Sequence, residues 1–537
     1  MEKKLSTWQK VDKTVCLLPA ILIAIAIILG LTIPQSFGNA ASKALSFMTT
    51  YFGWFYALGC LVLLVFCLWI GLSKHGKIKL GGKDAKPEMS FFSWFAITLT
   101  SGMAAGIVFY GVAEPLEYFT NPPIFTGWEA GSPAAAEGAL KYVFMHWCLH
   151  PYALYTSAGI CFALLIWNAK KKFTISTGLY PLIGEKVNGV PGKLVNALMV
   201  FATLGCVGTS FGIVTQQLSA GINYVFNTNF SPTSLAIFVI ATMTFFFILS
   251  ACTGVHKGIK YVSKANMYIF FALMLWAFLF GGTLFIINNT TTSIGQYLAL
   301  LIPQSFYLEP AYQSGWVGGW TIFYWAWWLS LCPIVGLFLI KLAKGRTLRQ
   351  FVLVNMVAPA IFAFAWFGIF GSSSIAMEMS NTGLGAEIAE NGIAIALFAY
   401  MKNLPLAPVL YILTFAAIVF SLVTLAESMV LTVADMTTKE EVLVQLEKEG
   451  KGSPRPLKIF WGVLMGLIAF TLLYSGGLTA LQTSVVICGF PLLFLMLFMA
   501  YGGVKFLRNR KEYDLTMEQE EKTAPEKDEQ TSDAATV

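Results

Sequence analysis

Two groups of aromatic residues lie inside apolar stretches of this sequence, where ring faces can hold a cation that donates no hydrogen bond. One group is Trp147, Tyr152 and Tyr155, whose spacing on a helix spreads over roughly 140° of one face. The other is Trp327 and Trp328, which end the run Phe-Tyr-Trp-Ala-Trp-Trp, around eleven residues inside their stretch. Each ring attracts a quaternary ammonium group by about 0.5 to 2 kcal/mol, so several rings are needed. The five residues are candidates for an aromatic cage, although any single Trp or Tyr can instead mark a membrane interface.

Two of the apolar stretches also contain residues that interrupt a helix. Residues 101–106 read Ser-Gly-Met-Ala-Ala-Gly, whose small side chains let the backbone unwind, and Pro333 removes a helical hydrogen bond shortly after Trp328. The two breaks lie about 225 positions apart, each in the middle of the first helix of a five-helix unit. Interrupted helices at matching positions of two inverted halves indicate the binding site of a secondary transporter. Met103 and Ala104 join the candidate substrate-binding residues.

The elements that must position these residues are membrane helices. The chain is 57% hydrophobic and only 12% charged, with a mean hydropathy of +0.69, whereas soluble domains carry about 25% charged residues. A crossing takes about 20 apolar residues, and the continuous apolar runs favour helices over barrel strands. The sequence therefore predicts an all-α polytopic membrane protein with twelve transmembrane helices. The predicted spans are residues 15–34, 51–73, 91–119, 142–168, 194–224, 232–251, 266–288, 316–342, 350–371, 407–435, 457–475 and 481–504.

Positive charge predicts the orientation of these spans, because short loops rich in Lys and Arg stay in the cytoplasm. If the N-terminus is in the cytoplasm, the loops on the other side of the membrane carry few positive charges beyond Lys43, Lys141 and Lys402. We expect a protein of the bacterial-type inner membrane with both termini in the cytoplasm, and we interpret the +7 charge as an orientation signal, not as evidence for nucleic acid binding. The inside connections contain Lys74, Lys77, Lys79, Lys83, Lys86, Lys170, Lys171, Lys172, Lys257, Lys260, Lys264, Lys341, Lys344, Arg346, Arg349, Arg455, Lys458, Lys505, Arg508 and Arg510.

Around the aromatic residues the sequence resembles the betaine/carnitine/choline transporter family, and the resemblance covers essentially all twelve spans. Its most specific segments are Gly-Trp-Thr-Ile-Phe-Tyr-Trp-Ala-Trp-Trp (319–328), Lys-Gly-Arg-Thr (344–347), Phe-Tyr-Gly-Val-Ala-Glu-Pro (109–115) and His-Trp-x-x-His-Pro (146–151). The resemblance implies a LeuT-like core of two inverted five-helix repeats preceded by two extra helices, commonly assembled as homotrimers. It also implies that the five aromatic residues form the cage, and Leu331 stands where relatives place a further aromatic ring.

On this interpretation the chain binds a small quaternary-ammonium substrate of the glycine betaine, carnitine or choline type and is surrounded by membrane lipid. It is expected to have six segments. The segments are a cytoplasmic N-terminus (1–14), two peripheral helices with a cytoplasmic loop (15–90), the first five-helix repeat (91–288), an extracytoplasmic amphipathic connection (289–315), the second five-helix repeat (316–504) and a charged, disordered cytoplasmic tail (505–537).

The residues that would bind a coupling ion match the sodium-coupled relatives only in part. Those relatives resemble one another in a Gly-x-Gly-x-Gly stretch, whose central glycine is replaced here, and in two pairs of hydroxyl residues. This chain keeps Thr203 but has Val207, and it keeps Thr424 but has Leu425. Each lost hydroxyl removes an oxygen ligand for sodium, although backbone carbonyls near the first break can remain.

Sodium-independent exchangers of the family carry an arginine and a methionine where this chain has Asn266 and Val335, so neither pattern fits completely. Cation-coupled uptake with Na⁺ or H⁺ is favoured, and ion-independent exchange of betaines such as carnitine and γ-butyrobetaine is the alternative. No other cofactor is expected. The candidate ion-site residues are Ser101, Met103, Thr203, Thr424 and Glu427.

Ionisable groups inside membrane spans call for a functional hypothesis because they are costly there. Glu427 is one such group and is equally compatible with an interhelical hydrogen bond. Glu114 precedes Pro115, so we expect it at a helix end, and we place His146 and His150 near the entrance of the fourth span.

Other classes of protein fit the sequence less well. The nine cysteines are scattered through apolar runs without metal or disulfide spacing, so no metal site is predicted. The loops contain no nucleophile–base arrangement and no phosphate-binding glycine loop, which argues against an enzyme. A channel and a transporter-like sensor are the remaining rivals, and a sensor would be expected to carry a signalling domain.

Overall fold

The protein folds as helices, because a backbone in lipid can satisfy its N–H and C=O groups only within helices or a closed barrel. The computed structural model describes residues 6–101, 105–253, 256–449 and 451–517, and among them strand-type pairing is limited to two isolated bridges. The long helices are α2 (Lys13–Thr32), α3 (Pro34–Leu72), α9 (Val190–Phe226), α10 (Pro232–Thr253), α11 (His256–Phe280), α12 (Thr283–Phe306), α16 (Ala358–Met379), α19 (Ala407–Met436) and α21 (Arg455–Arg508).

Shorter helices complete the fold and include those that carry the candidate site. They are α1 (Thr7–Lys10), α4 (Phe91–Ser101), α5 (Ala105–Thr120), α6 (Pro133–Trp147), α7 (Leu149–Ala163), α8 (Tyr180–Ile183), α13 (Phe323–Leu329), α14 (Cys332–Lys341), α15 (Leu348–Val352), α17 (Leu384–Asn391), α18 (Ala396–Lys402), α20 (Glu440–Lys448) and α22 (Arg510–Tyr513).

The predicted count of twelve membrane-crossing helices is not confirmed by helix length and composition alone. Within the described residues, nine helical segments are long and apolar enough to cross, and a bent pair, Gly318–Leu329 with Cys332–Lys341, makes a tenth if it is one span. α21 is counted as one crossing segment, although the sequence predicts two spans there, 457–475 and 481–504. Gly477, which has a φ of 55°, interrupts the helix between them. The predicted span 91–119 is divided between α4 and α5 by residues outside the described ones. The all-helical, multi-span class is thus confirmed, and the count of twelve stays a prediction.

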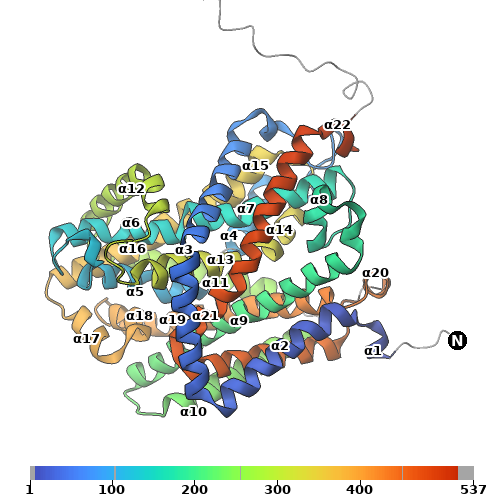
Figure 1. Cartoon of the computed structure of the whole chain (residues 1–537). Coiled ribbons are helices and arrows are strands. Elements are labelled where there is room, and N and C mark those ends of the chain that lie inside the picture. Colours follow the sequence, from blue (N-terminus) through green and yellow to red (C-terminus); the bar gives the residue numbers. More distant parts are fainter. Residues whose placement is uncertain (1–5, 102–104, 254–255, 450, 518–537) are drawn as a thin grey trace, which may run out of the picture.

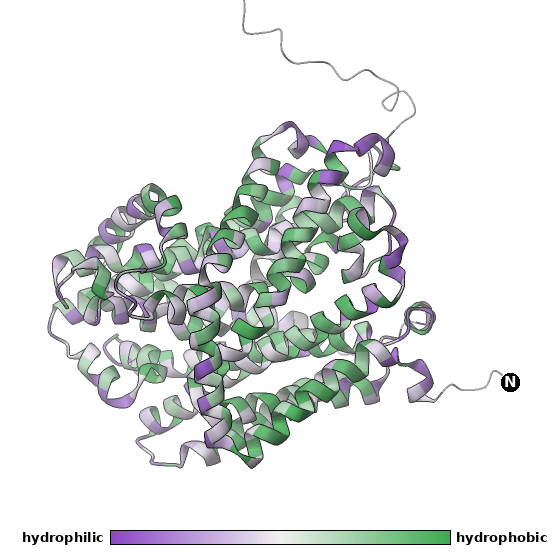
Figure 2. Cartoon of the chain, viewed as in Figure 1, coloured by the Kyte–Doolittle hydropathy of each residue, from purple (hydrophilic) through white to green (hydrophobic). Residues whose placement is uncertain are grey.

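Burial separates central from peripheral helices. In the most apolar window of Pro133–Asn168, 94% of the residues are buried, and the value for α9 is 89%, against 33% for α2. α2 turns apolar side chains such as Ile21 and Ile28 outward, as expected for a lipid-facing helix. Figure 2 shows that the helices are mainly hydrophobic, while hydrophilic residues gather at their ends and connections.

The two longest helices, α3 and α21, run side by side through the molecule (Figure 1). Glycine allows them to approach closely, because a Cβ atom at Gly59 would lie 2.7 Å from the side chain of Leu493. Close contacts at small residues are typical of helix packing in membranes, where apolar burial alone gives no preference for protein over lipid.

Two predicted segment boundaries are wrong. The span predicted to end at residue 288 ends at Phe280, because Gly281 and Gly282 separate α11 from α12 and Gly282 has a φ of 89°. The tail predicted to be disordered from residue 505 is helical through α22 and is anchored by Asp514. This buried carboxylate accepts hydrogen bonds from Asn168 Nδ2 at 3.2 Å and Arg510 Nε at 2.9 Å. Residues 518–537 of the tail lie outside the described residues.

Candidate substrate site

The helix break predicted around Pro333 is confirmed. α13 and α14 meet at 46°, with Ser330 and Leu331 between them. Pro333 lies in the first turn of α14, where its missing N–H costs no intrahelical bond. The hydroxyl of Ser330 donates to the carbonyl of Ala326 at 2.8 Å, and Leu331 is buried at the bend. Trp327 and Trp328 therefore lie in the last turn before the break.

The other predicted break falls between α4 and α5. Met103 and Ala104 lie outside the described residues, and so does the side chain of Ser101. Gly106, in the first turn of α5, is described: a Cβ atom there would lie 2.9 Å from Cη2 of Trp327 and 3.0 Å from Cη2 of Trp147. Only a glycine lets the start of α5 approach these two rings so closely. The first turn of α5 is thereby placed at the aromatic cluster.

Trp147, Tyr152 and Tyr155 do not share one helix face, as the sequence had suggested. α6 ends at Trp147, and Cys148 has φ −102° and ψ −110°, so that Tyr152 and Tyr155 belong to the separate helix α7. The kink at Cys148 interrupts the predicted span 142–168, which is still one candidate membrane span but begins earlier, at Pro133.

The five predicted cage residues nevertheless lie together, around Trp328. Its ring centroid is 5.8 Å from that of Trp147, 5.5 Å from Tyr152 and 5.2 Å from Tyr155, all in edge-to-face orientations. Trp327 joins through Trp147 at 6.4 Å, and its indole N–H donates to Ser210 Oγ at 3.2 Å. All five side chains are buried.

Rings of α13 also contact the cluster, since Tyr324 lies 5.0 Å from Trp147 and Phe323 lies 5.5 Å from Trp327. The sequence analysis missed two more rings, which come from other helices. Tyr110 of α5 lies 5.9 Å from Trp147 and 6.3 Å from Trp327, and Phe367 of α16 lies 5.0 Å from Trp147. Tyr110 stands in the segment 109–115 that carries the family resemblance, so its position offered a signal. Phe367 has no such signal, because only helix packing brings α16 to the cluster.

Glu114 lies directly behind the cluster and not at a helix end, which corrects the expectation based on Pro115. α5 continues through Pro115 to Thr120, and the carboxylate is fully buried. Glu114 Oε2 accepts the indole N–H of Trp147 at 2.7 Å, and Oε1 lies 2.7 Å from His146 Nδ1 and accepts from the hydroxyl of Tyr118 at 3.1 Å. The buried side chain of Glu114 thus orients one cage ring through a hydrogen bond.

The candidate ion-site residues are more dispersed. The hydroxyl of Thr203 on α9 donates to Met199 O at 2.8 Å, and that of Thr424 on α19 donates to Phe420 O at 2.8 Å. Glu427 is buried on α19. Among the described residues no hydrogen bond joins Thr203 to Thr424. Each hydroxyl oxygen keeps lone pairs for a cation, so the ion site stays a prediction.

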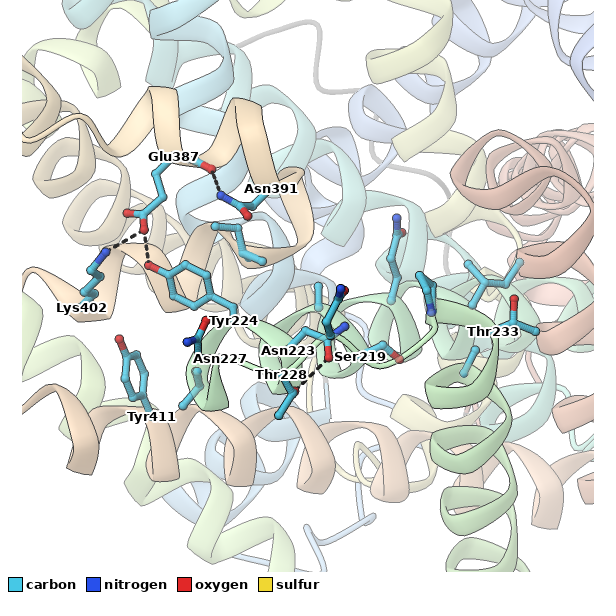
Figure 3. Close-up of a pocket in the computed structure, with 18 of the residues that line it drawn as sticks. Ser219, Asn223, Tyr224, Asn227, Thr228, Thr233, Glu387, Asn391, Lys402 and Tyr411 are labelled. Carbon is cyan, nitrogen blue, oxygen red and sulfur yellow. Dashed lines mark hydrogen bonds and ion pairs between the residues drawn. The ribbon is translucent and has the colours of Figure 1, made fainter.

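A cavity of about 960 Å³ lies away from the cage, between the end of α9, α10, α17, α18, α19 and α21. None of the five cage residues lines it. Figure 3 shows Glu387 of α17 pointing toward Tyr224 and Lys402, whose hydroxyl and ammonium groups lie 2.7 and 2.8 Å from its carboxylate. Burial alone would raise the pKa of Glu387, but these two donors hold it below its ordinary value.

Comparison with known proteins supports the resemblance of the motifs. The family model described as betaine/carnitine/choline family transporter matches residues 14–512. A protein of Desulfitobacterium hafniense named "Probable glycine betaine transporter" is 34% identical over 93% of this chain and 98% of its own length. The glycine betaine transporter OpuD of Bacillus subtilis is 38% identical over 89% of this chain and 91% of its own length. The ectoine/hydroxyectoine transporter of Virgibacillus pantothenticus is 37% identical over 91% of this chain and 95% of its own length. With a family match over nearly its whole length and an interrupted helix at the aromatic cluster, this chain belongs to the betaine/carnitine/choline transporter family and is a transporter, not an enzyme.

Proposed function

We propose that this protein is a secondary transporter that carries a small quaternary-ammonium solute of the glycine betaine, carnitine or choline type across the cell membrane by alternating access. The observation that carries the proposal is the contact of Trp328 with Trp147, Tyr152 and Tyr155 beside a helix break. Ring faces attract a methylated cation, and the backbone groups freed at a break can bind the carboxylate of a zwitterion. Similarity to proteins named as glycine betaine and ectoine transporters supports a small zwitterion.

Transport is cation-coupled uptake in this proposal. The ion would be held by Thr203, Thr424 and Glu427 together with backbone oxygens near Ser101 and Met103. Ion-independent exchange of betaines such as carnitine is the second candidate, and a specific observation favours it. Val207 and Leu425 stand where sodium-coupled relatives carry hydroxyls, so two oxygen ligands are lost.

The finer architecture belongs to the same proposal. Counting α21 as two spans at Gly477, α4 with α5 as one, and α13 with α14 as one gives twelve spans, arranged as two extra helices and two inverted five-helix repeats. Both termini are cytoplasmic, and the subunits form homotrimers in the inner membrane. Apolar side chains exposed on α12, such as Leu284 and Leu298, are suited to burial between subunits.

Purified protein in lipid vesicles tests the proposal. We expect saturable uptake of labelled glycine betaine, and faster entry of label when the vesicles are preloaded with unlabelled substrate, because a carrier reorients in either direction with cargo bound. Choline, carnitine and ectoine as competitors define the cargo. Imposing a sodium gradient, a proton gradient or neither separates coupled uptake from exchange.

Each outcome of this experiment decides one point. Conductance without counterflow would reject the carrier. Counterflow that needs no ion would favour the exchanger, and accumulation that follows an ion gradient would identify the coupling ion. Saturable flux of ectoine alone would replace the quaternary-ammonium cargo with another zwitterion.

A further inference from the structure

Glu114 and His146 form a buried acid–base pair behind the aromatic cage. Glu114 Oε1 lies 2.7 Å from His146 Nδ1, and neither side chain is accessible to solvent. The other ring nitrogen, His146 Nε2, lies 2.9 Å from the hydroxyl of Thr321. Hydrogen-bonding groups therefore run without interruption from Thr321 through the imidazole to the carboxylate.

The outer end of this chain of groups reaches a second cavity. Thr321 lines a cavity of about 210 Å³ that is also lined by Gln304, Lys141 and Trp316. Both side-chain polar atoms of Gln304 are buried and have no partner among the described residues. A cavity of this size with polar groups such as Thr321 and Gln304 in its lining can hold water. Water in the cavity can therefore exchange protons with the hydroxyl of Thr321.

The inner end reaches the cage, because Glu114 Oε2 accepts the indole N–H of Trp147 at 2.7 Å. Trp147 in turn contacts Trp327 and Trp328. An ionised Glu114 makes this hydrogen bond charge-assisted, and such bonds are about twice as strong as neutral ones. The protonation of Glu114 thus affects both the orientation of a cage ring and the charge next to it.

The charge of the pair is not balanced by its immediate neighbours. A carboxylate beside a neutral imidazole carries one negative charge, and the other donors to Glu114 are the neutral Tyr118 and Trp147. Among the described residues that line the cavity at Thr321, the cationic side chain is Lys141, whose ammonium lies over the rings of Trp128 and Tyr142. The titratable side chains around the pair are Tyr110, Glu117 and Tyr118 of α5, Lys141 and Tyr142 of α6, His150 of α7 and Tyr324 of α13.

We propose that Glu114 and His146 bind one proton in competition with the cationic head of the cargo, and that this proton enters from the cavity at Thr321. Both positive charges are stabilised by the same buried carboxylate, so each lowers the affinity for the other. The pair then makes cargo affinity depend on pH. Only this competition with cargo rests on the proposed function; the proton site itself does not.

The proton transfer is balanced at each group. A hydronium ion in the cavity gives a proton to Thr321 Oγ1 and leaves as water, while the hydroxyl proton of Thr321 passes to His146 Nε2. The proton on Nδ1 passes to Glu114 Oε1, which leaves a neutral imidazole with its proton on Nε2 and a neutral carboxylic acid. The pair changes from a charge of −1 to 0, and only bonds to hydrogen form and break.

Infrared difference spectra of the full chain in lipid, recorded between pH 8.5 and pH 5 without cargo, test the proton site directly. We expect the band of a buried carboxylic acid to appear at low pH in the natural protein and to be absent in Glu114→Gln. Glu117→Gln is the matched control, because Glu117 lies one turn further along α5 and bonds Asn121 instead of His146. A band that persists in Glu114→Gln, or no band in the natural protein, would overturn the site.

The dependence of transport on external pH tests the competition. Binding that displaces one proton weakens by up to tenfold for each unit by which pH falls. The KM of labelled glycine betaine should therefore rise as pH falls, and Glu114→Gln should flatten this profile while Glu117→Gln retains it. Identical profiles in the natural protein and Glu114→Gln would refute the competition. If the natural protein carries no glycine betaine at all, the proposed function fails, and the infrared spectra still decide the proton site.

Thr321→Val tests the route while leaving the pair intact. The substitution removes the hydroxyl but keeps the shape of the side chain. We expect the carboxylic acid band to appear several-fold more slowly after a drop in external pH. An unchanged rate would show that the proton enters by another path.

Discussion

Trp328 is the residue on which the proposed cage depends most. It is the common neighbour of Trp147, Tyr152 and Tyr155, and it stands in the last turn before the bend of its span. Its indole nitrogen is buried without a hydrogen-bond partner among the described residues. The ring of Trp147 is oriented by its hydrogen bond to Glu114, whereas Trp328 packs edge-to-face against three rings.

Trp328→Leu should raise the KM for a quaternary-ammonium cargo about two- to thirtyfold, because one ring contributes about 0.5 to 2 kcal/mol to cation binding. Saturable uptake of labelled cargo into vesicles measures this change. Trp325→Phe is the control, since Trp325 is equally buried in α13 but stacks on His150, outside the five cage residues. An unchanged KM in Trp328→Leu would mean that Trp328 does not contact the cargo.

At the scale of elements, the position of α13 is set by its contact with the second half of α21. A Cβ atom at Gly489 of α21 would lie 2.8 Å from the carbonyl oxygen and 3.0 Å from the Cα atom of Ala326. Backbone atoms cannot move aside as a flexible side chain can. Gly489 therefore fixes how closely the cage helix approaches α21.

Gly489→Ala should destabilise the protein by about 1 to 3 kcal/mol, the usual cost of forcing an extra methyl group into a packed contact. It should also reduce the maximal uptake rate, because α13 carries two of the cage rings. Gly319→Ala is a suitable comparison, since a Cβ atom at Gly319 meets nothing within 4 Å. Thermal unfolding of the purified protein measures the difference, and equal midpoints for the two variants would contradict the argument.

For the whole molecule, the distribution of Lys and Arg predicts which side of each connection is cytoplasmic. A green fluorescent protein fused after residue 517 should fluoresce, because this reporter matures in the cytoplasm. It does not mature after it has been exported unfolded across the membrane. Alkaline phosphatase inserted between Asn227 and Ser231, in the connection between α9 and α10, should be active, because this enzyme needs the oxidising side of the membrane. The opposite pattern of activity would reverse the proposed orientation.

The class of the protein could be predicted from the sequence because its causes are local. About 20 consecutive apolar residues cross a bilayer whatever their neighbours are, and a proline interrupts its own helix. The multi-span helical class and the bend before Pro333 followed from these rules and are confirmed. The aromatic runs were equally visible, because their residue types alone suggest a chemistry.

The contacts between distant helices were decided only by the tertiary structure. Glu114 and Trp147 are 33 residues apart, and no sequence pattern indicated that α6 ends at Trp147 or that these two side chains meet. Phe367 and Thr321 reach the site because α16 and the start of the bent span pack against α6. Periodicity reports which face of a helix is apolar, but the packing of side chains between helices decides which faces meet. For this reason the sequence indicated the rings of the cage, and the fold revealed the carboxylate that orients one of them.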